Sequence, residues 1–519
     1  MWHRIEDVRL SSVGVGAKPE LLLASLLREK LGVAVRDWRI LAKTVDARRG
    51  APVLIYTLAA ETAEVPRTGL KLKAIAPEEM AALENPDPGL PDDPAKVDSP
   101  LVVGTGPCGI FAALGLALAG CKPVIIDRGF EVERRDRDYA EFLRSRELDP
   151  ESNLLIGEGG AGTYSDGKLY TGARNERSAF ILKTFIEAGA PPEIGYLKRP
   201  HIGSDYLGRV AKSLRRKLES LGAKFIFGTE VTDVLIENGR CVGVKTRNGG
   251  TLRSDAVVLA PGLGARELNA ALRKRVTFSL KGFQLGCRIE HPQRMVDRMQ
   301  YHLTNRPAAL EAAEYHLLSR PARGKSVSSF CMCPGGQVVM ASAWEKRLVS
   351  NGMSCHARSL EYANSALIVT LEPGEFANPE EAFGLLAKLE GEAFRMGGSD
   401  YTFPAQDAAG FLRGEKVLRN VAGSAATGMR PARLDMLVPG GVRSALKEAI
   451  RHFDRNFNEF ALSGKLLGVE SCVSSPVRFE REEGSLASSV PGLWIGGEFG
   501  GWAGGIMSAA GDGLKLATA

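Results

Sequence analysis

The sequence predicts an α/β protein in three parts: a Rossmann-like dinucleotide-binding domain, a mixed α+β domain inserted into it, and a small α/β domain in front of both. Three observations support this class. A GxGxxG turn follows an apolar strand at residues 101–109, a three-stranded meander leads into a buried strand at 231–262, and an apolar strand with a glycine-rich turn lies at 493–505. The meander distinguishes this pattern from a plain α/β fold, in which it is unusual.

Composition limits the functional class. The chain has 519 residues, enough for several domains, and it is 44% hydrophobic and 25% charged. This balance is typical of globular proteins and excludes disordered, collagen-like and disulfide-scaffold classes. The 67 basic and 61 acidic residues leave a net charge of +6, which is too small to indicate a nucleic-acid partner. The 59 glycines are more than the ~7% that is usual in proteins, and three clusters contain much of this excess.

The sequence also bears on location and metal binding. The charged start, Met1–Asp7, lacks the apolar core of a signal peptide, and the apolar stretch 101–120 carries GTGPCG, which favours a strand, turn and helix over a membrane span. The eight cysteines form no CxxC pair, and the seven histidines form no HxxxH or HExxH set. We therefore expect a cytoplasmic protein without a metal site, whose partner is a small molecule rather than nucleic acid or a membrane.

The first domain is expected to span residues 1–95, linker included. Glu20–Leu31 has apolar residues at helical spacing, and Ala34–Leu41 and Val53–Leu58 have the composition of strands. Residues 85–99 contain four prolines and four aspartates, which is typical of a linker. A domain boundary is therefore expected there.

The dinucleotide-binding domain is expected in two pieces, 98–275 and 466–519, with a substrate or cap domain inserted at 276–465. Hairpin turns at Asn238-Gly239 and at 248–250 join the meander strands. Its elements are expected at 205–221 (helix), 225–227, 231–236, 241–246, 251–253 and 256–262 (strands). In the insertion, strands are expected at 338–341 and 366–369 and a helix at 379–394.

The first glycine cluster predicts a dinucleotide site. Gly104 permits a tight turn, Gly106 lets the backbone approach a pyrophosphate, and Gly109 allows close helix packing. The helix that follows starts near Pro107 and turns its free N–H groups toward the phosphates. A second strand, 123–126, ends in Asp127, which is placed to bind a ribose hydroxyl and argues against a 2′-phosphate. The alternative is a tight turn with a solvated aspartate.

Two further glycine clusters predict ligand contacts. In 157–168, backbone amides are free to approach an anion or a flat ring, Thr163 and Ser165 add hydroxyls, and Lys168 adds a cation. The alternative there is a flexible surface loop. In 496–513, a strand ends at Glu498 and a small-residue helix follows, whose N-terminus can stabilise negative charge. Close packing of that helix on the sheet explains the same residues, and both interpretations can hold together.

These clusters together resemble the glutathione-reductase-like superfamily of FAD proteins. Several segments further resemble a bacterial family described as FAD-dependent dehydrogenases or NAD(P)/FAD-dependent oxidoreductases: GEGGAGTYSDGKLYT (157–171), SFCMCPGGQVV (329–339), NGMS (351–354), GWAGGIMSAAGDG (501–513) and, for its N-terminal domain, KTVDARR (43–49). The resemblance covers nearly the whole chain.

The resemblance implies FAD as the cofactor. It also implies that the first GxGxxG and its acid bind the ADP half of FAD. The strand that ends in Ala260-Pro261-Gly262 matches an ATG-type signature of that superfamily. The strand before Glu498 is then the last strand of the FAD domain. The residues expected to bind FAD are Gly104, Gly106, Pro107, Cys108, Gly109, Asp127, Arg128, Gly159, Gly160, Gly162, Thr163, Ser165, Lys168, Val231, Ala260, Gly262, Gly497, Glu498, Gly504, Gly505 and Ile506.

The expected function is an FAD-dependent oxidoreductase, a dehydrogenase or reductase that passes a hydride through flavin N5 to or from a small molecule. The sequence lacks a second GxGxxG, because Gly262-Leu263-Gly264 has no third glycine, so NAD(P)H is expected only as a transient reductant. One alternative is an FAD-dependent monooxygenase. Another, of a different class, is a non-catalytic FAD-binding module whose residues 1–95 dock a partner.

Two groups are candidates for chemistry beside the flavin. Lys168 is the candidate for a positive charge near the ring, and the alternative is a lysine that is solvated or paired with Asp166 or Glu158. Cys331 and Cys333 are expected on one face of a regular strand, with Cα atoms roughly 6.5 Å apart, at the long limit of disulfide geometry. They are either buried structural thiols or thiols with a redox or substrate-facing role.

Overall fold

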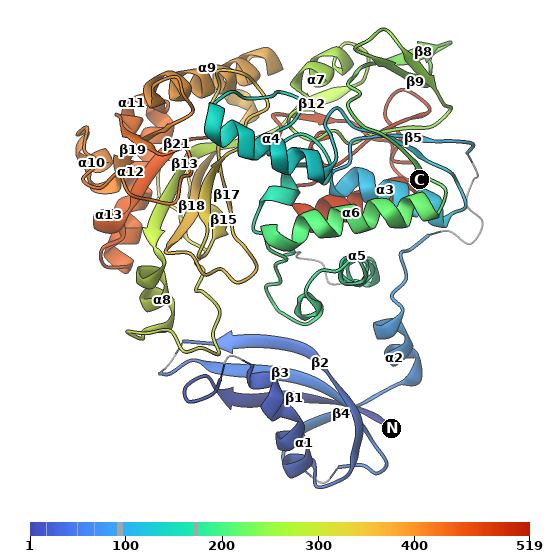
Figure 1. The fold of residues 1–519 in the computed structure, drawn as a ribbon, viewed down its shortest axis with the longest axis vertical. Coiled ribbons are helices and arrows are strands. Elements are labelled where there is room, and N and C mark those ends of the chain that lie inside the picture. The colour runs from blue at the N-terminus through green and yellow to red at the C-terminus, as the bar shows by residue number, and fades with distance from the viewer. Residues whose placement is uncertain (17, 49, 67, 91–96, 171–174, 519) are drawn as a thin grey trace.

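The computed structural model describes residues 1–519 except 17, 49, 67, 91–96, 171–174 and 519. Two domains form the upper body, and a smaller lobe lies below them (Figure 1). A parallel sheet with helices, an inserted mixed α+β domain and an N-terminal α/β lobe are all present, so the predicted fold class is confirmed.

The N-terminal lobe is a four-stranded sheet in the order β2-β3-β1-β4, with helix α1 packed on it. Two of its strands, β1 and β4, were not predicted, because charged residues dominate them; in β1 the buried Ile5 and Val8 nevertheless face the core. The predicted helix and strands are present. The elements are β1 (Trp2–Ser11), α1 (Leu23–Leu31), β2 (Val35–Asp46), β3 (Val53–Thr62), β4 (Lys71–Ile75) and α2 (Pro77–Glu84).

The predicted linker follows helix α2. Its residues 91–96 lie outside the described part of the chain, and strand β5 begins at Leu101. The lobe also touches both other domains: the Lys43 amide donates to the Tyr196 carbonyl, and Leu310 of the inserted domain packs in the core of the lobe.

The dinucleotide domain is built on a five-stranded parallel sheet in the order β23-β11-β5-β6-β7. Both sheet faces are covered, because alternate residues of its short strands point to opposite sides. Val102 and Val258 pack against helices α3 and α14, whereas Val103 and Val257 pack against the meander and α7. The sheet strands are β5 (Leu101–Val103), β6 (Val124–Ile126), β7 (Lys224–Ile226), β11 (Val257–Leu259) and β23 (Leu493–Ile495).

The predicted meander is confirmed almost residue for residue, as β10-β9-β8 with turns at the predicted glycines. Its strands are β8 (Val231–Glu237), β9 (Arg240–Thr246) and β10 (Thr251–Arg253). The helices of the domain are α3 (Pro107–Leu118), α4 (Val132–Ser145), α5 (Glu176–Glu187), α6 (Ser204–Ser220), α7 (Arg266–Leu272) and α14 (Ile506–Leu516).

The cap domain contains a seven-stranded sheet in the order β14-β15-β18-β13-β21-β19-β20 and a hairpin of β16 and β17. Its strands are β13 (Phe283–Pro292), β14 (Leu318–Ser319), β15 (Val327–Cys333), β16 (Gln337–Met340), β17 (Ser350–Met353), β18 (Tyr362–Leu371), β19 (Phe403–Asp407), β20 (Met429–Pro431) and β21 (Lys465–Glu470). Its helices are α8 (Gln293–Tyr301), α9 (Pro379–Gly397), α10 (Ala408–Arg413), α11 (Leu434–Leu437), α12 (Gly440–Asn456) and α13 (Phe460–Ser463).

The two chain crossings between these domains run side by side. Strand β12 (Phe278–Leu280) pairs with β22 (Val477–Phe479), one on the way into the cap and one on the way out. Strand β21 pairs with β13 and β19 inside the cap sheet, so the chain leaves that sheet a few residues after the boundary predicted at 465. The exact boundaries stay a prediction.

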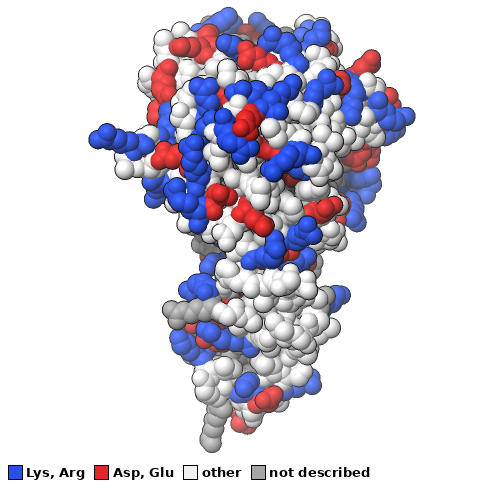
Figure 2. Space-filling view, turned by 90° about the vertical axis from the view of Figure 1, so that its left-hand side faces the viewer, with Lys and Arg blue, Asp and Glu red and all other residues white. Residues whose placement is uncertain are grey.

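The surface carries both signs of charge. On the face drawn in Figure 2, basic and acidic side chains are interspersed over the upper body. Among the described residues, no helix has the length and apolar character needed to cross a membrane.

Candidate functional site

The three glycine clusters meet at one edge of the parallel sheet. Gly104 follows β5, Asp127 follows β6, Ala260 follows β11 and Gly496 follows β23, so all lie at the carboxyl ends of their strands. Open α/β sheets bind ligands at this edge. A pocket of about 1120 Å³, open solvent included, lies there. The topology therefore brings together clusters that are far apart in the sequence.

The first glycine turn leaves space for a ligand beside helix α3. Gly104 has φ +103°, and a Cβ there would overlap the Ala260 carbonyl, while one at Gly109 would overlap the Gly104 carbonyl. Gly106 differs, because a Cβ there would meet no atom within 4 Å. It is the N-cap of α3 and has no capping side chain. The free end of the helix thus faces open space, which fits a pyrophosphate.

Asp127 lines this pocket and also supports the turn. Its Oδ2 accepts hydrogen bonds from the amide and hydroxyl of Thr105, and its Oδ1 accepts one from the Gly129 amide at 2.8 Å. The carboxylate is therefore buried and bonded rather than solvated, which removes the alternative of a solvated aspartate. Its contact with a ribose stays a prediction.

The second glycine cluster is held rigidly by two charged residues. Arg135 of α4 is fully buried and donates to the carbonyls of Asn153, Glu158 and Gly160. The Glu158 carboxylate accepts from the Val132 amide and pairs with Arg215 at 2.8 Å. The cluster is thus no flexible loop.

The hydroxyls of this cluster do not reach the pocket. Thr163 donates to the Glu158 carbonyl and Ser165 donates to the Gly162 carbonyl. Short-range bonds of this kind are common for Ser and Thr, because their hydroxyls lie close to nearby backbone groups. Gly160 and Gly162, by contrast, line the pocket.

The third cluster closes the pocket. Glu498 Oε1 accepts a hydrogen bond from the Gly505 amide at 2.9 Å, at the start of helix α14. Burial raises the pKa of the Glu498 carboxyl, and this hydrogen bond opposes the rise. Asp512, on the next turns of α14, is paired with Arg481 and accepts from the Gly497 amide. The packing interpretation is therefore confirmed, and the N-terminus of the helix lines the pocket; its contact with a ligand stays a prediction.

Most of the predicted site residues line this pocket: Gly104, Gly106, Pro107, Cys108, Asp127, Arg128, Gly160, Gly162, Val231, Ala260, Gly262, Gly497, Glu498, Gly505 and Ile506. Within the described chain, six others fall outside its lining: Gly109, Gly159, Thr163, Ser165, Lys168 and Gly504. Lining residues that the sequence did not single out include Leu155, Ile156, Glu230, Glu267 and Leu268. Glu230 stands directly before the first meander strand, and this position in the sequence could have identified it as a pocket residue.

Lys168 lies at the junction of the dinucleotide and cap domains. Its Nζ is 3.1 Å from Asp166 Oδ2, so the pairing considered as the alternative is present. The contact lacks hydrogen-bond alignment, and among the described residues the buried ammonium has no hydrogen-bond acceptor. The Asp166 carboxylate also accepts two hydrogen bonds from one edge of the Arg358 guanidinium, from Nε at 2.9 Å and from Nη2 at 2.6 Å. These cations hold the pKa of the Asp166 carboxyl well below its ordinary value, against the opposing effect of burial.

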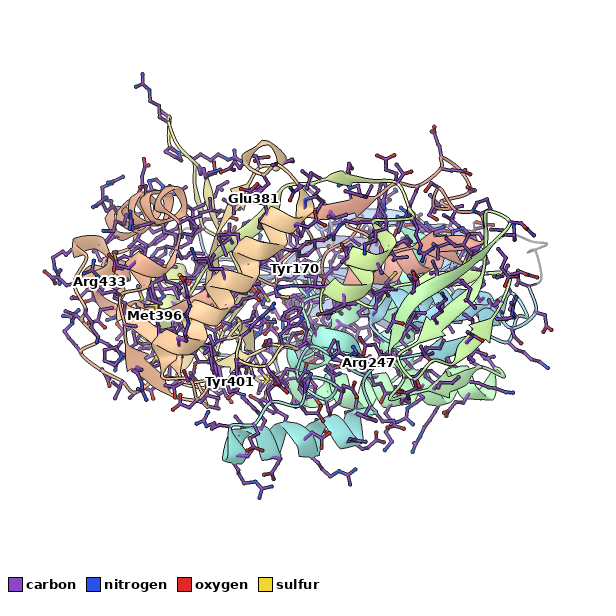
Figure 3. All side chains as sticks on the ribbon, turned by 90° about the horizontal axis from the view of Figure 1, so that it is seen from above. Tyr170, Arg247, Glu381, Met396, Tyr401 and Arg433 are labelled. Carbon is purple, nitrogen blue, oxygen red and sulfur yellow. The ribbon has the colours of Figure 1, made fainter. Side chains whose placement is uncertain are left out.

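More polar contacts join the two domains at the same junction. The Tyr170 hydroxyl, labelled in Figure 3, donates to Glu314 of the cap at 2.6 Å, and Arg199 pairs with Glu314 at 2.8 Å. His201 Nε2 lies 2.9 Å from the His356 carbonyl oxygen, and the two rings stack. Charged side chains thus bind the cap to the dinucleotide domain beside the pocket.

Strand β15 departs from the regular geometry that was predicted for it. Its register with β18 shifts between Phe330 and Cys333, and Cys331 has φ +44°. The prediction of a regular strand through Cys331 and Cys333 was therefore wrong, because a bulge redirects the backbone between them.

The comparisons with known proteins point to FAD. The family described as "FAD-dependent protein, C-terminal domain-like" matches residues 282–472, and the family "FAD dependent oxidoreductase" matches 206–327. An uncharacterized protein of Clostridium beijerinckii is 36% identical over 524 residues, which cover 98% of each chain.

Solved structures are more distant. A geranylgeranyl bacteriochlorophyll reductase-like protein of Thermoplasma acidophilum has a TM-score of 0.36 and 12% identity, covering 81% of this chain and 77% of its own. L-proline dehydrogenase of P. horikoshii has a TM-score of 0.33 and 12% identity, covering 82% and 93%. Likenesses this distant say nothing about the substrate.

Proposed function

The chain belongs to the FAD-dependent oxidoreductase family, and on that premise we propose that it is a dehydrogenase or reductase that moves a hydride to or from a small-molecule substrate. FAD is its cofactor, and when bound it supplies the hydride chemistry at flavin N5. The observation that carries the proposal is the pocket at the carboxyl edge of the sheet, which ends at Glu498 and Gly505 beside the cap domain. We propose the predicted residues that line it as the FAD contacts.

In this proposal the chain's own residues bind and orient the cofactor and shield its reacting end from water. The open space at Gly106 and the free N-terminus of α3 hold the pyrophosphate. Asp127 fixes the turn, and Arg135 fixes the facing loop. The Asp166–Arg358 pair, almost without solvent exposure, closes the junction where the cap would cover the reacting end.

The experiment is anaerobic mixing of the purified holoprotein with NADH or NADPH, followed by flavin absorbance. The proposal predicts bleaching of the flavin and its recovery with an organic electron acceptor. Oxygen uptake that requires an organic substrate and inserts oxygen into it would instead establish a monooxygenase. A flavin that no nicotinamide or organic donor reduces would contradict the proposal and favour a non-catalytic FAD-binding module with a docking lobe.

We further propose that the protein acts in the cytoplasm on a small molecule, without nucleic acid or membrane as a partner. The support is the free thiol of the exposed Cys355, which suits a reducing compartment, and the mixed charge of the surface in Figure 2. Cell fractionation of the native host tests the location, and recovery in the membrane or secreted fraction would contradict it.

A further inference from the structure

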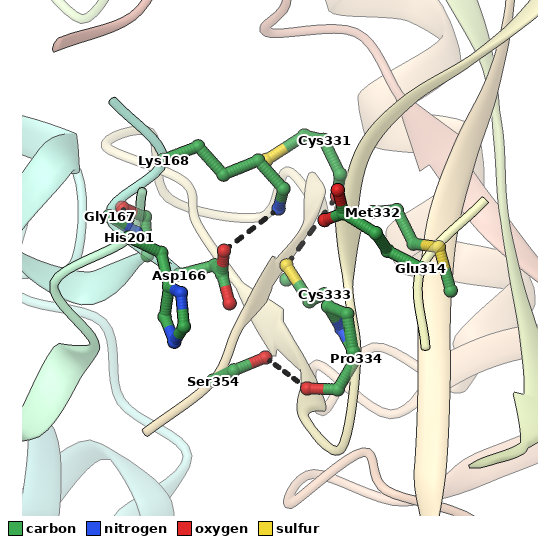
Figure 4. Close-up of polar contacts among 12 residues, drawn as sticks. Asp166, Gly167, Lys168, His201, Glu314, Cys331, Met332, Cys333, Pro334 and Ser354 are labelled. Atoms are coloured by element: carbon green, nitrogen blue, oxygen red, sulfur yellow. Dashed lines mark hydrogen bonds and ion pairs between the residues drawn. The ribbon is translucent and has the colours of Figure 1, made fainter. Parts of the chain in front are cut away.

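Two thiols stand at the junction, on cap strand β15 (Figure 4). The left-handed backbone at Cys331 and the register shift before Cys333 form a bulge, a device that redirects side chains beside functional sites. The bulge turns Cys333 back toward its neighbour, since its Sγ lies 3.5 Å from the Cys331 carbonyl oxygen. The Cys333 thiol therefore lies against the backbone of Cys331 at the bulge.

The surroundings hold this bulge in place. Arg288 is fully buried, pairs with Glu470 at 2.8 Å, and donates to the Cys331 carbonyl at 3.3 Å. Gly352, from the NGMS segment, leaves the room that these groups need, because a Cβ there would lie 3.0 Å from Cys333 Sγ. A strained backbone that is supported from several sides is typical of a functional position.

The charges around the thiols favour a thiolate at Cys331. A hydrogen bond from the Cys333 thiol lowers the pKa of Cys331, and the cations of Lys168 and Arg288 lower it further, against the effects of burial and of Glu470. The same contacts, with burial, raise the pKa of Cys333. Lys168 reaches the pair from the dinucleotide domain, beside Asp166, as Figure 4 shows.

The pair also lies near the loop that lines the cofactor pocket, because Lys168, drawn beside the thiols in Figure 4, follows Gly160 and Gly162 of that lining in the same loop. A charge on Cys331 contributes to the raised pKa of Glu498, which lines that pocket, so the two groups are electrostatic neighbours. Cys331 is half-buried, whereas Cys333 has no exposed surface. Burial thus shields Cys333 from solvent, whereas Cys331 remains partly accessible.

We propose that Cys331 and Cys333 are a second redox centre, a dithiol–disulfide couple that exchanges an electron pair with the FAD. In oxidation an S–S bond forms between the Cys331 thiolate and Cys333, the Cys333 S–H bond breaks, and two electrons and one proton pass to FAD, which becomes FADH⁻. The reverse direction restores the thiolate and the thiol. Lys168 stabilises the thiolate that forms or leaves. This goes beyond the proposed function, because it gives the electrons a site within the protein besides the flavin.

The first test measures the thiols directly in the wild-type holoprotein. Samples are equilibrated in glutathione buffers from reduced to oxidised, quenched in acid, unfolded, labelled with N-ethylmaleimide and digested with trypsin. The peptide 326–346 contains Cys331 and Cys333 and no other cysteine. We expect two labels in reducing buffer and none in oxidising buffer, in one two-electron transition. Two labels in every buffer, or one label with one glutathione adduct, would overturn the proposal.

Variants separate the pair from the other thiols. Cys333→Ser should retain glutathione on Cys331, because the resolving thiol is gone. Cys355→Ser is the matched control, since it removes an exposed thiol and should leave the transition of peptide 326–346 unchanged.

The second test counts electrons. In anaerobic dithionite titration, wild type should take up four electrons per FAD before reduction is complete, and Cys331→Ser should take up two. Two electrons for wild type would show that the pair does not exchange with the flavin. This readout is independent of the proposed substrate reaction, because dithionite reduces the flavin whether or not NAD(P)H does.

Discussion

The cofactor pocket and the domain junction are formed by different kinds of chemical groups. The pocket is formed by backbone, glycines and apolar side chains at strand ends, and its charged members stand at its rim or hold its turns. The junction is formed by buried charged side chains that pair across domains. Asp166, for example, binds Arg358, which lies 192 residues further along the sequence. The backbone conformation therefore shapes the pocket, whereas ion pairs between side chains hold the junction together.

This difference predicts that the junction is the more sensitive region to loss of a side chain. Arg358→Met should lower the free energy of unfolding by about 3 kcal/mol, because it leaves Asp166 buried with Lys168 alone. Arg430→Met is the matched control, since its pair with Asp400 is 3.7 Å long and exposed, and it should cost under ~1 kcal/mol. Urea denaturation measures both, and equal costs would show that burial adds nothing to the sensitivity of the junction pair.

The junction should also respond to acid. Burial, aided by Arg358, lowers the pKa of His201 to about 4, whereas the unfolded chain titrates it near 6.5. A lowered folded pKa means that stability is present above pH 6.5 and is lost as the pH falls toward 4. The loss should reach roughly 3 kcal/mol at most. His201→Gln should flatten the stability profile in this window, and His316→Gln, at an exposed side chain, should not.

In the pocket, Asp127 is the side chain with the largest expected effect on the cofactor. Asp127→Ala removes the acceptor that fixes Thr105 and Gly129, and it removes the proposed ribose contact. A hydrogen bond to a charged group is worth roughly 1.5–3 kcal/mol, so FAD affinity should fall about 10- to 100-fold. Asp127→Asn, which keeps one acceptor, should lie between. Fluorescence titration of the apoprotein gives both constants, and an unchanged value for Asp127→Ala would refute a binding role.

The same difference explains how much could be predicted from the sequence. The pocket could be predicted because each glycine cluster is contiguous and follows a strand, so local patterns imply its place in the sheet. The bonds of Thr163 and Ser165 could not, because Ser and Thr hydroxyls have nearby backbone partners that compete with a ligand. Arg135 was missed because one buried arginine in the charged segment VERRDRD looks like its exposed neighbours.

The contacts that cross the junction could not be predicted, although the sequence did offer Asp166 as a partner of Lys168 within one loop. Lys168, Arg288 and Cys331 come from separate elements, and only the packing of two domains brings them together. The bulge at Cys331 likewise has no sequence signal, because CMC alternates as a regular strand would.

Gly106→Val tests whether FAD occupies the pocket at the carboxyl edge of the sheet. A Cβ at Gly106 meets no protein atom within 4 Å, and the backbone, with φ −69°, is in a region open to side chains. The variant should therefore fold with an unchanged apoprotein melting temperature but should fill the space that the cofactor needs. Gly384→Ala, equally free of contacts but in the cap, is the control. We expect a yellow wild type and control, with about one FAD per chain released by acid, and a colourless, folded Gly106→Val; a Gly106→Val protein that retains FAD at wild-type affinity would show that FAD binds elsewhere.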